Sequence, residues 1–241
     1  MKTVVHKADS RGFADHDWLQ ANHSFSFANF HDPMKMHFGA LRVLNDDVIA
    51  PKMGFATHPH NNMEIITIPL KGILKHRDNI RHKEWQQVLP GEVQIMSAGT
   101  GVEHSEINGS EREHLSLFQI WIIPNKQNVS PRYDQKNFEI KDRKNKLQIL
   151  VSSIDEDLEG SLKINQDAII STIELSKGEQ FIYNIKSENH GVYILNINGE
   201  VEVNSEILNT RDAIGVSEGD RFTIKANKES QILFIEVPML F

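Results

Sequence analysis

The chain has 241 residues, of which 39% are hydrophobic and 24% charged, and its 26 Lys and Arg against 33 Asp and Glu give a formal charge of −7. This composition is typical of a water-soluble globular protein with one large or two small domains. The absence of cysteine excludes disulfide scaffolds, thiol nucleophiles, thiolate metal sites and iron–sulfur clusters. Any chemistry must therefore use histidine, carboxylate or hydroxyl groups, or a bound ion.

The N-terminal segment MKTVVHKADS lacks an apolar core of signal-peptide length, and apolar runs such as 65–70 and 120–124 have only the length of a strand. We therefore expect a cytoplasmic protein without membrane-spanning segments. The acidic balance disfavours direct nucleic-acid binding, because phosphate recognition needs clustered Lys and Arg.

Short strands separated by turn residues are expected along most of the chain. In the first half they are 58–70, 73–76, 92–97 and 115–123, with a glycine-rich turn at 98–101. After a polar connector over 125–146, strands are expected at 147–153, 168–175, 181–185, 191–197, 200–204, 221–226 and 232–237. Because helical periodicity is nearly absent, the sequence predicts an all-β protein.

The two halves share an order of apolar strands and glycine turns, which indicates internal repetition. The matching pairs are 64–75 with 191–202, 90–99 with 209–219, and 117–124 with 232–238. We therefore predict two similar antiparallel β-barrels in tandem, the first over residues 1–130 and the second over residues 131–241.

Two pairs of candidate metal ligands lie in the first barrel, where eleven of the twelve histidines also lie. His58 and His60 are two residues apart, as are His104 and Glu106. Residues two apart on a strand point to the same face. If neighbouring strands bring the pairs together, one ion would meet three neutral imidazoles and one carboxylate. Such a set suits Fe(II), Ni(II), Mn(II), Cu(II) or Zn(II).

The repeat provides a control for this interpretation. In the second barrel, the positions equivalent to the two ligand pairs hold Ile185 with Ser187 and Ile224 with Ala226. The fold pattern is therefore present without the ligands, so folding alone does not demand them. We predict one metal site per chain, in the N-terminal half.

Other polar residues compete with this assignment. Glu64 lies six residues after His58 on the same expected strand face, so it is an alternative carboxylate ligand or a residue that orients a histidine. We expect His76 to be a hydrogen-bonded residue at the rim of the site. The remaining N-terminal histidines lack paired spacing, and we interpret them as structural or surface residues. They are His6, His16, His23, His31 and His37.

Residues 54–72 and 90–108 resemble the two cupin motifs. Five segments extend the resemblance to the pirin family of bicupins: 23–33, 37–47, 58–67, 76–78 and 96–106. The resemblance covers about residues 5–124, while the second half matches in architecture only. It implies two tandem cupin (jelly-roll) barrels, of which the second lacks metal ligands.

The resemblance also implies a function. It assigns His58, His60, His104 and Glu106 as ligands of one divalent ion, Fe(II) being the ion expected first, and leaves Glu64 outside the ligand set. It implies a dioxygenase that opens flavonols such as quercetin with O₂. Because a bound divalent ion makes the flavonol hydroxyl easier to deprotonate, we expect Glu106 to bend away from the metal and take this proton. Two alternatives remain: a metal- or redox-sensing regulator acting through a protein partner, as eukaryotic pirin does, and a cupin isomerase or purely structural bicupin.

Overall fold

The computed structural model describes all 241 residues. It contains 22 strands, two short 3₁₀ helices, η1 (Ala8–Ser10) and η2 (Ile140–Arg143), and no α-helix. The all-β class expected from the sequence is confirmed. None of the helices has the length and apolar character needed to cross a membrane.

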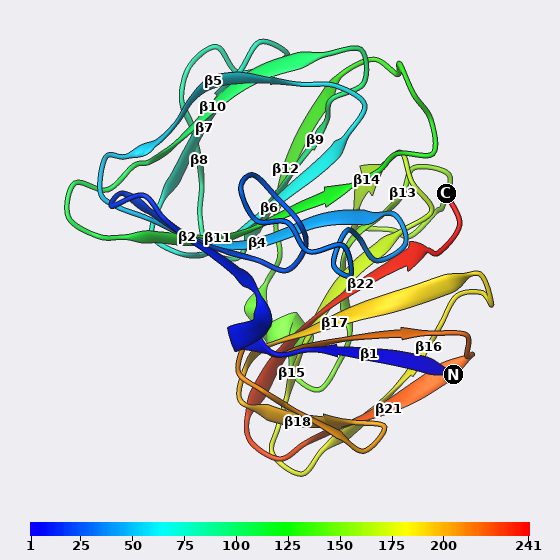
Figure 1. Ribbon diagram of the computed structural model, residues 1–241. Helices are drawn as coiled ribbons and strands as arrows, with labels where there is room; N and C mark the ends of the chain where they lie inside the picture. Colours follow the sequence, from blue (N-terminus) through cyan, green and yellow to red (C-terminus); the bar gives the residue numbers. More distant parts are fainter.

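The strands form four sheets stacked as layers (Figure 1). Two seven-stranded sheets face each other in the middle of the molecule, and a four-stranded sheet covers the outer face of each. Each large sheet and its small sheet form one barrel-like sandwich. The chain thus contains two such barrels, as the internal repetition predicts.

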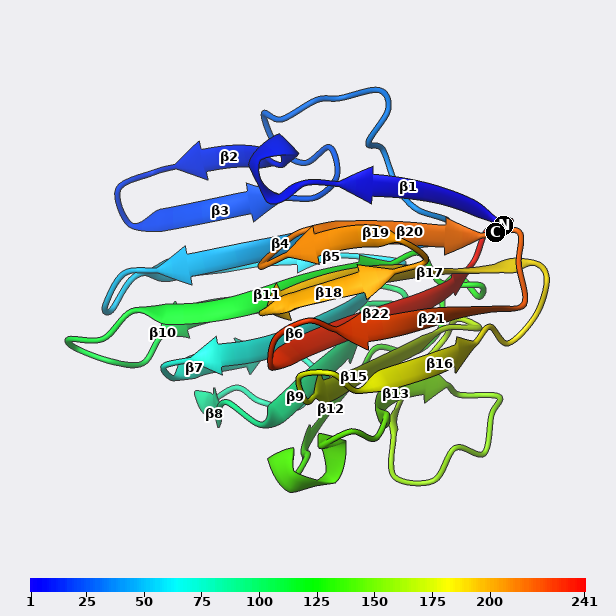
Figure 2. The same cartoon turned by 90° about the horizontal axis from the view of Figure 1, so that it is seen from below.

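The N-terminal barrel holds the segments with the candidate ligands. Its large sheet consists, in spatial order, of β12 (Arg132–Asn137), β9 (Glu92–Ser97), β6 (Glu64–Lys71), β11 (Leu115–Ile122), β4 (Leu41–Ile49), β3 (Leu19–His23) and β2 (Gly12–Asp15). Its small sheet consists of β5 (Gly54–His60), β10 (Val102–Asn108), β7 (Leu74–Asp78) and β8 (Gln86–Val88). Figure 2 shows β2 and β3 at one edge of the molecule and β12 near the opposite edge.

The C-terminal barrel repeats this plan. Its large sheet consists of β1 (Lys2–His6), β20 (Ala213–Ser217), β17 (His190–Asn198), β22 (Ser230–Pro238), β15 (Ile169–Leu175), β13 (Gln148–Ser153) and β14 (Leu162–Ile164). Its small sheet consists of β16 (Gln180–Asn184), β21 (Arg221–Ala226), β18 (Glu200–Val203) and β19 (Glu206–Asn209). All pairings in this barrel are antiparallel except that of β13 with β14.

Each barrel receives one strand from the other side of the boundary expected at residue 130. The N-terminal strand β1, which Figure 1 shows in the C-terminal barrel, pairs with β20, and β12 pairs with β9 of the N-terminal barrel. The prediction of a polar connector over 125–146 is therefore wrong in part, because residues 132–137 form β12. β12 is an edge strand in which Tyr133 is the only buried residue. Its amino-acid composition therefore resembles that of a loop.

The main hydrophobic core lies between the two large sheets. It has 25 buried residues from both barrels, among them Phe118 and Ile120 of β11 and Tyr193 and Leu195 of β17. Central strands such as β17 are buried on both faces, which explains why they read as nearly continuous apolar runs. This core fixes the two barrels against each other.

The interiors of the two barrels differ sharply. The C-terminal barrel encloses 16 buried apolar residues, including Ile185, Ile224 and Ala226. The N-terminal barrel encloses only two small apolar clusters, of seven and four residues. The control drawn from the repeat is thus consistent with the structure, because three of the four positions equivalent to the candidate ligands pack in an ordinary core and the fourth, Ser187, is exposed. The N-terminal interior is left for polar groups.

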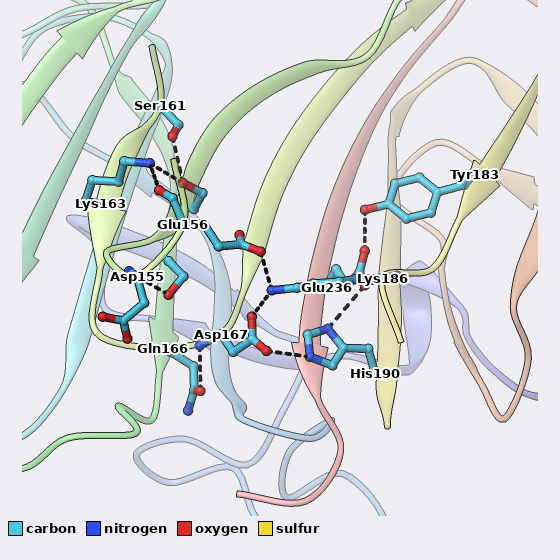
Figure 3. A network of polar contacts seen from close by, with 12 residues as sticks. Asp155, Glu156, Ser161, Lys163, Gln166, Asp167, Tyr183, Lys186, His190 and Glu236 are labelled. Atoms are coloured by element: carbon cyan, nitrogen blue, oxygen red, sulfur yellow. Dashed lines mark hydrogen bonds and ion pairs between the residues drawn. The ribbon is translucent and has the colours of Figure 1, made fainter. Parts of the chain in front are cut away.

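His190, the single histidine of the second half, is part of a polar network in the C-terminal barrel (Figure 3). Its Nδ1 lies 3.2 Å from an oxygen of Glu236 and its Nε2 lies 3.2 Å from an oxygen of Asp167. Tyr183 donates a 2.8 Å hydrogen bond to Glu236, and Lys186 pairs with Asp167. Both ring nitrogens are engaged, so His190 joins β17 to β22 and to the loop before β15 and is no candidate ligand.

Candidate metal centre

The small sheet of the N-terminal barrel places the candidate ligands on adjacent strands. His104 of β10 lies directly opposite His58 of β5, and Glu106 lies opposite His76 of β7. The register of β10 against β5 shifts between His104 and Glu106, a bulge of the kind that redirects side chains next to functional sites. Gly54 permits the backbones of β5 and β10 to approach closely, because a Cβ at this position would lie 2.1 Å from the carbonyl oxygen of Glu106.

Three imidazoles converge on one point at the end of these strands. The Nε2 of His104 lies 2.9 Å from Nε2 of His58 and 3.0 Å from Nε2 of His60. The Nδ1 of His58 lies 2.8 Å from the carbonyl oxygen of Ala56, so Nδ1 carries the proton and Nε2 presents its lone pair to the centre. Converging lone pairs repel each other unless a cation lies between them.

The spacing of the three nitrogens fits a metal ion. Two nitrogen ligands that are each about 2.1 Å from an ion and subtend a right angle lie about 3.0 Å apart. This matches the two distances at His104. The sequence-based expectation that His58, His60 and His104 come together is met, and their donors suit a divalent first-row metal.

Glu106 lies beside this cluster. Its ligand oxygen falls within 4.8 Å of ring nitrogens of both His104 and His76, in a second group that shares His104 with the first. Gln119 donates a 2.7 Å hydrogen bond to Oε2 of Glu106, whereas Oε1 is buried without a partner. Burial raises the pKa of Glu106, an effect opposed by the nearby imidazoles of His76 and His58. The free Oε1 is available to a metal ion or a substrate proton.

His76 is a buried neighbour of His104 and Glu106. It is fully buried, so the expectation of a rim residue is wrong, although its hydrogen bonding is as expected. Its Nε2 lies 3.0 Å from Asp78 and its Nδ1 lies 3.1 Å from the amide of Gln94. Burial alone would raise the pKa of Asp78, but hydrogen bonds from His76 and from backbone N–H groups hold it well below its usual range. With both ring nitrogens engaged, His76 positions its neighbours and is not a ligand.

Two imidazoles of the cluster, those of His60 and His104, are held neutral. Burial, followed by the neighbouring His58, lowers the pKa of His60 to about 4. Burial and the surrounding imidazoles likewise lower the pKa of His104, to about 2. Neutral imidazole is the form that binds metal. These two imidazoles are therefore ready to accept an ion at neutral pH.

A row of polar side chains crosses the large sheet and faces the cluster. Its members are neighbours in register on five strands and are all buried: His23, Asn45, Gln119, Thr67 and Gln94. His23 Nδ1 lies 2.9 Å from the side-chain oxygen of Asn45, so its structural assignment is supported but it is not at the surface. This row replaces the apolar interior seen in the other barrel.

A cavity of about 600 Å³ opens in front of the imidazoles. Aromatic rings of Trp18, Phe27, Phe55 and Trp121 form much of its wall. The polar lining consists of His23, Asn45, Asp47, Thr57, His58, His60, His104, Glu106 and Gln119. A cavity of this size, with an apolar wall and a few converging polar groups, suits a small aromatic ligand.

Comparison with known proteins places the chain in a family. The model of the pirin family matches residues 4–122, and that of the quercetinase C-terminal cupin domain matches residues 150–237. The quercetin 2,3-dioxygenase of Escherichia coli K12 is 43% identical over 234 residues, which cover 97% of this chain and 98% of that protein. The chain belongs to the pirin family.

Solved structures agree with this assignment. The bacterial pirin YhhW of Escherichia coli in complex with nickel(II) has a TM-score of 0.91 and 40% identity, covering 98% of this chain and 99% of that one. Among relatives known by sequence, a putative quercetin 2,3-dioxygenase of Zymomonas mobilis is 41% identical over 224 residues, which cover 93% of this chain and 93% of that protein. The bicupin fold expected from the sequence is confirmed. A metal cofactor in this pirin is supported by its own imidazole cluster and by the nickel-bound relative.

Glu64 does not belong to the centre of this pirin. The strand expected over 58–70 is broken after His60, and β6, which begins at Glu64, lies in the other sheet of the barrel. The two oxygens of Glu64 accept hydrogen bonds from Ser97 and from Asn165 of the C-terminal half. The same-face argument therefore fails for Glu64, which joins the two halves instead.

Asp47 is one of the cavity residues that the sequence analysis missed, together with Asn45 and Gln119. It is 3% exposed, and its Oδ1 is buried without a partner. A signal was present, because two adjacent carboxylates on one strand must point to opposite faces of the sheet. One of Asp46 and Asp47 therefore had to face the interior.

Proposed function

We propose that this pirin is a metal-dependent dioxygenase that opens flavonols such as quercetin with O₂, using an ion held by His58, His60, His104 and Glu106. The observation that carries the proposal is the convergence of three imidazole nitrogens beside a buried carboxylate oxygen without a partner, in an aromatic cavity. Relatives named quercetin 2,3-dioxygenase support it over nearly the whole chain.

The ion itself supplies one element of the chemistry. A bound divalent ion would act as a Lewis acid and make the flavonol 3-hydroxyl easier to deprotonate. We propose Fe(II) as this ion. The ligand set also accommodates Ni(II), Mn(II), Cu(II) and Zn(II), so each is a matched comparison in a loading experiment.

Glu106 would turn away from the ion to receive the proton of the flavonol 3-hydroxyl at Oε1, the one oxygen that has no partner within the protein. Its other oxygen is fixed by Gln119, whose own side-chain oxygen lies 3.3 Å from the indole nitrogen of Trp121. This chain of hydrogen bonds fixes the carboxylate plane and leaves Oε1 without a partner. Because burial raises the pKa of Glu106, its carboxylate is a stronger base than an exposed one.

The aromatic wall would bind and orient the flat ring system of the substrate. Trp18 and Phe55 have ring centroids 5.3 Å apart and nearly perpendicular planes, and Phe27 and Trp121 form a second such pair at 5.4 Å. These pairs hold the wall rigid and exclude water from one side of the bound ring. Apolar contact of this kind is worth about 25 cal/mol per Å² of buried surface.

The test combines metal content with oxygen uptake on one preparation. We expect His58→Ala to lose the metal and the quercetin-dependent oxygen uptake together, while it keeps the fold. His114→Ala is the matched control, because it removes an exposed imidazole outside the cavity. Full metal content in the His58 variant would refute the ligand assignment. A loaded wild-type protein that consumes no oxygen with any of the five metals would refute the dioxygenase.

A further inference from the structure

Two adjacent carboxylates of β4 have opposite surroundings. Asp46 Oδ2 lies 2.8 Å from Nε of Arg211 and 3.3 Å from Nη1 of Arg11, so it is ion-paired on the face that is turned away from the cavity. Asp47 lines the cavity, makes no side-chain hydrogen bond through its buried Oδ1, and is 3% exposed. The carboxylate of Asp46 thus has two arginine partners on one face of β4, whereas Oδ1 of Asp47 has no partner on the other face.

The neighbours of Asp47 explain why it has no partner within the protein. In register, Ala21 of β3 lies on one side of it and Leu117 of β11 lies on the other. Neither offers a polar side chain. Asn45, two residues earlier on the same face, is already bonded to His23. Buried polar groups in native structures almost always have a partner, so an exception calls for an occupant from outside the chain.

Asp47 reaches the cavity from a different sheet than the imidazoles do. It lies on the large sheet, whereas His58, His60 and His104 lie on or at the end of strands of the small sheet. The small side chain of Ala21 beside it leaves room next to the carboxyl group. Burial, followed by the charges of Asp46 and Glu106, raises the pKa of Asp47 to about 8, so at neutral pH the group offers both a donor and an acceptor.

We propose that Asp47 binds a second oxygen function of the substrate, a hydroxyl or carbonyl group on an edge of the aromatic system away from the oxygen held at the imidazoles. The inference rests on the proposed function and narrows its substrate class to aromatics with oxygen substituents at two separated positions. Flavonols that carry only the 3-hydroxyl and the ring carbonyl would fill the cavity but leave Asp47 without a partner.

The experiment compares 3-hydroxyflavone, which has no further hydroxyl group, with galangin and quercetin, which have several. Dissociation constants are measured by quenching of tryptophan fluorescence on Ni(II)-loaded protein under argon, so that binding is read without turnover. We expect wild-type protein to prefer the polyhydroxylated flavonols by about 10-fold, the affinity equivalent of one hydrogen bond to a buried polar group.

Two variants of Asp47 and one control separate recognition from structure. Asp47→Leu, which has the same number of side-chain heavy atoms, should abolish the preference and leave binding of 3-hydroxyflavone within about 2-fold, whereas Asp47→Asn, which keeps a donor and an acceptor, should retain most of it. Asp46→Asn should lower stability without changing the preference. Thermal unfolding of each variant verifies folding, and Asp47→Leu should be no less stable than wild type because it removes an unpaired polar group.

Equal weakening of all three flavonols in Asp47→Leu, or an unchanged preference, would overturn the proposal. A preference lost in Asp47→Leu but retained in Asp47→Asn supports it. If the loaded protein binds flavonols with this preference but never consumes oxygen, the dioxygenase fails while recognition by Asp47 stands. If no flavonol binds at all, both are refuted.

Discussion

The stability of the protein should depend on pH through Asp47, and Asp47→Asn isolates this dependence. Burial raises the pKa of Asp47 from 3.8 to about 8. Between these values the folded protein keeps a proton that the unfolded chain has lost. Stability therefore falls as pH rises through this window, by about 1.4 kcal/mol per pH unit, and is reduced in full above the folded pKa.

The amide introduced by Asp47→Asn cannot titrate, so the variant lacks this pH-dependent loss. The difference between its free energy of unfolding and that of wild type should increase in favour of the variant by about 2–3 kcal/mol from about pH 5 to about pH 7. Any constant effect of the amide cancels in the slope. Urea unfolding of both metal-free proteins, run side by side at several pH values, gives the difference directly. A difference that is independent of pH would show that Asp47 is ionised in the folded state and would refute the reasoning.

Three further predictions concern the ligands, the base and the second barrel. His104→Ala should lose the bound metal while its unfolding remains cooperative, as measured by elemental analysis and circular dichroism; retained metal would contradict the assignment. Gln119→Leu removes a hydrogen bond that lowers the pKa of Glu106, so the acidic limb of the pH–rate profile should move to higher pH; an unmoved limb would exclude Glu106 as the base. Tyr183→Phe, which takes a donor from buried Glu236, should cost about 2 kcal/mol of unfolding free energy in urea and leave metal content unchanged; an effect on metal would show that the barrels are coupled.

Local spacing predicted the part of the site that depends on a single strand. Pairs of residues two apart put His58 with His60 and His104 with Glu106, and the structure brings the three histidines together. The glycine turns and apolar runs likewise indicated two similar barrels. These features follow from the two-residue period of a strand, which the sequence displays directly.

Features that depend on where the chain changes sheet could not be predicted in the same way. Glu64 shares the spacing of a ligand, but the break after His60 sends it into the other sheet. The polar neighbours of His76 in the sequence indicate a rim residue, although pairing with β10 buries its side chain completely. The edge strand β12 reads as a loop because only Tyr133 on it is well buried. In each case a tertiary contact, and not the local pattern, decides the outcome.

The unsatisfied groups were also hidden from the sequence. Whether the carboxyl group of Asp47 or that of Asp46 meets an arginine depends on which face of β4 is turned to the C-terminal half, where Arg211 lies. The same holds for Oε1 of Glu106, which is unpartnered because Gln119 bonds only the other oxygen. Register across strands far apart in sequence sets both outcomes.

Oxygen uptake with quercetin, measured per bound metal ion on wild-type protein and on Glu106→Gln, tests the central claim most directly. The account predicts uptake that rises in proportion to metal occupancy in the wild type and is lost in Glu106→Gln at equal occupancy. Undiminished uptake in Glu106→Gln, or none in fully loaded wild-type protein, would contradict it.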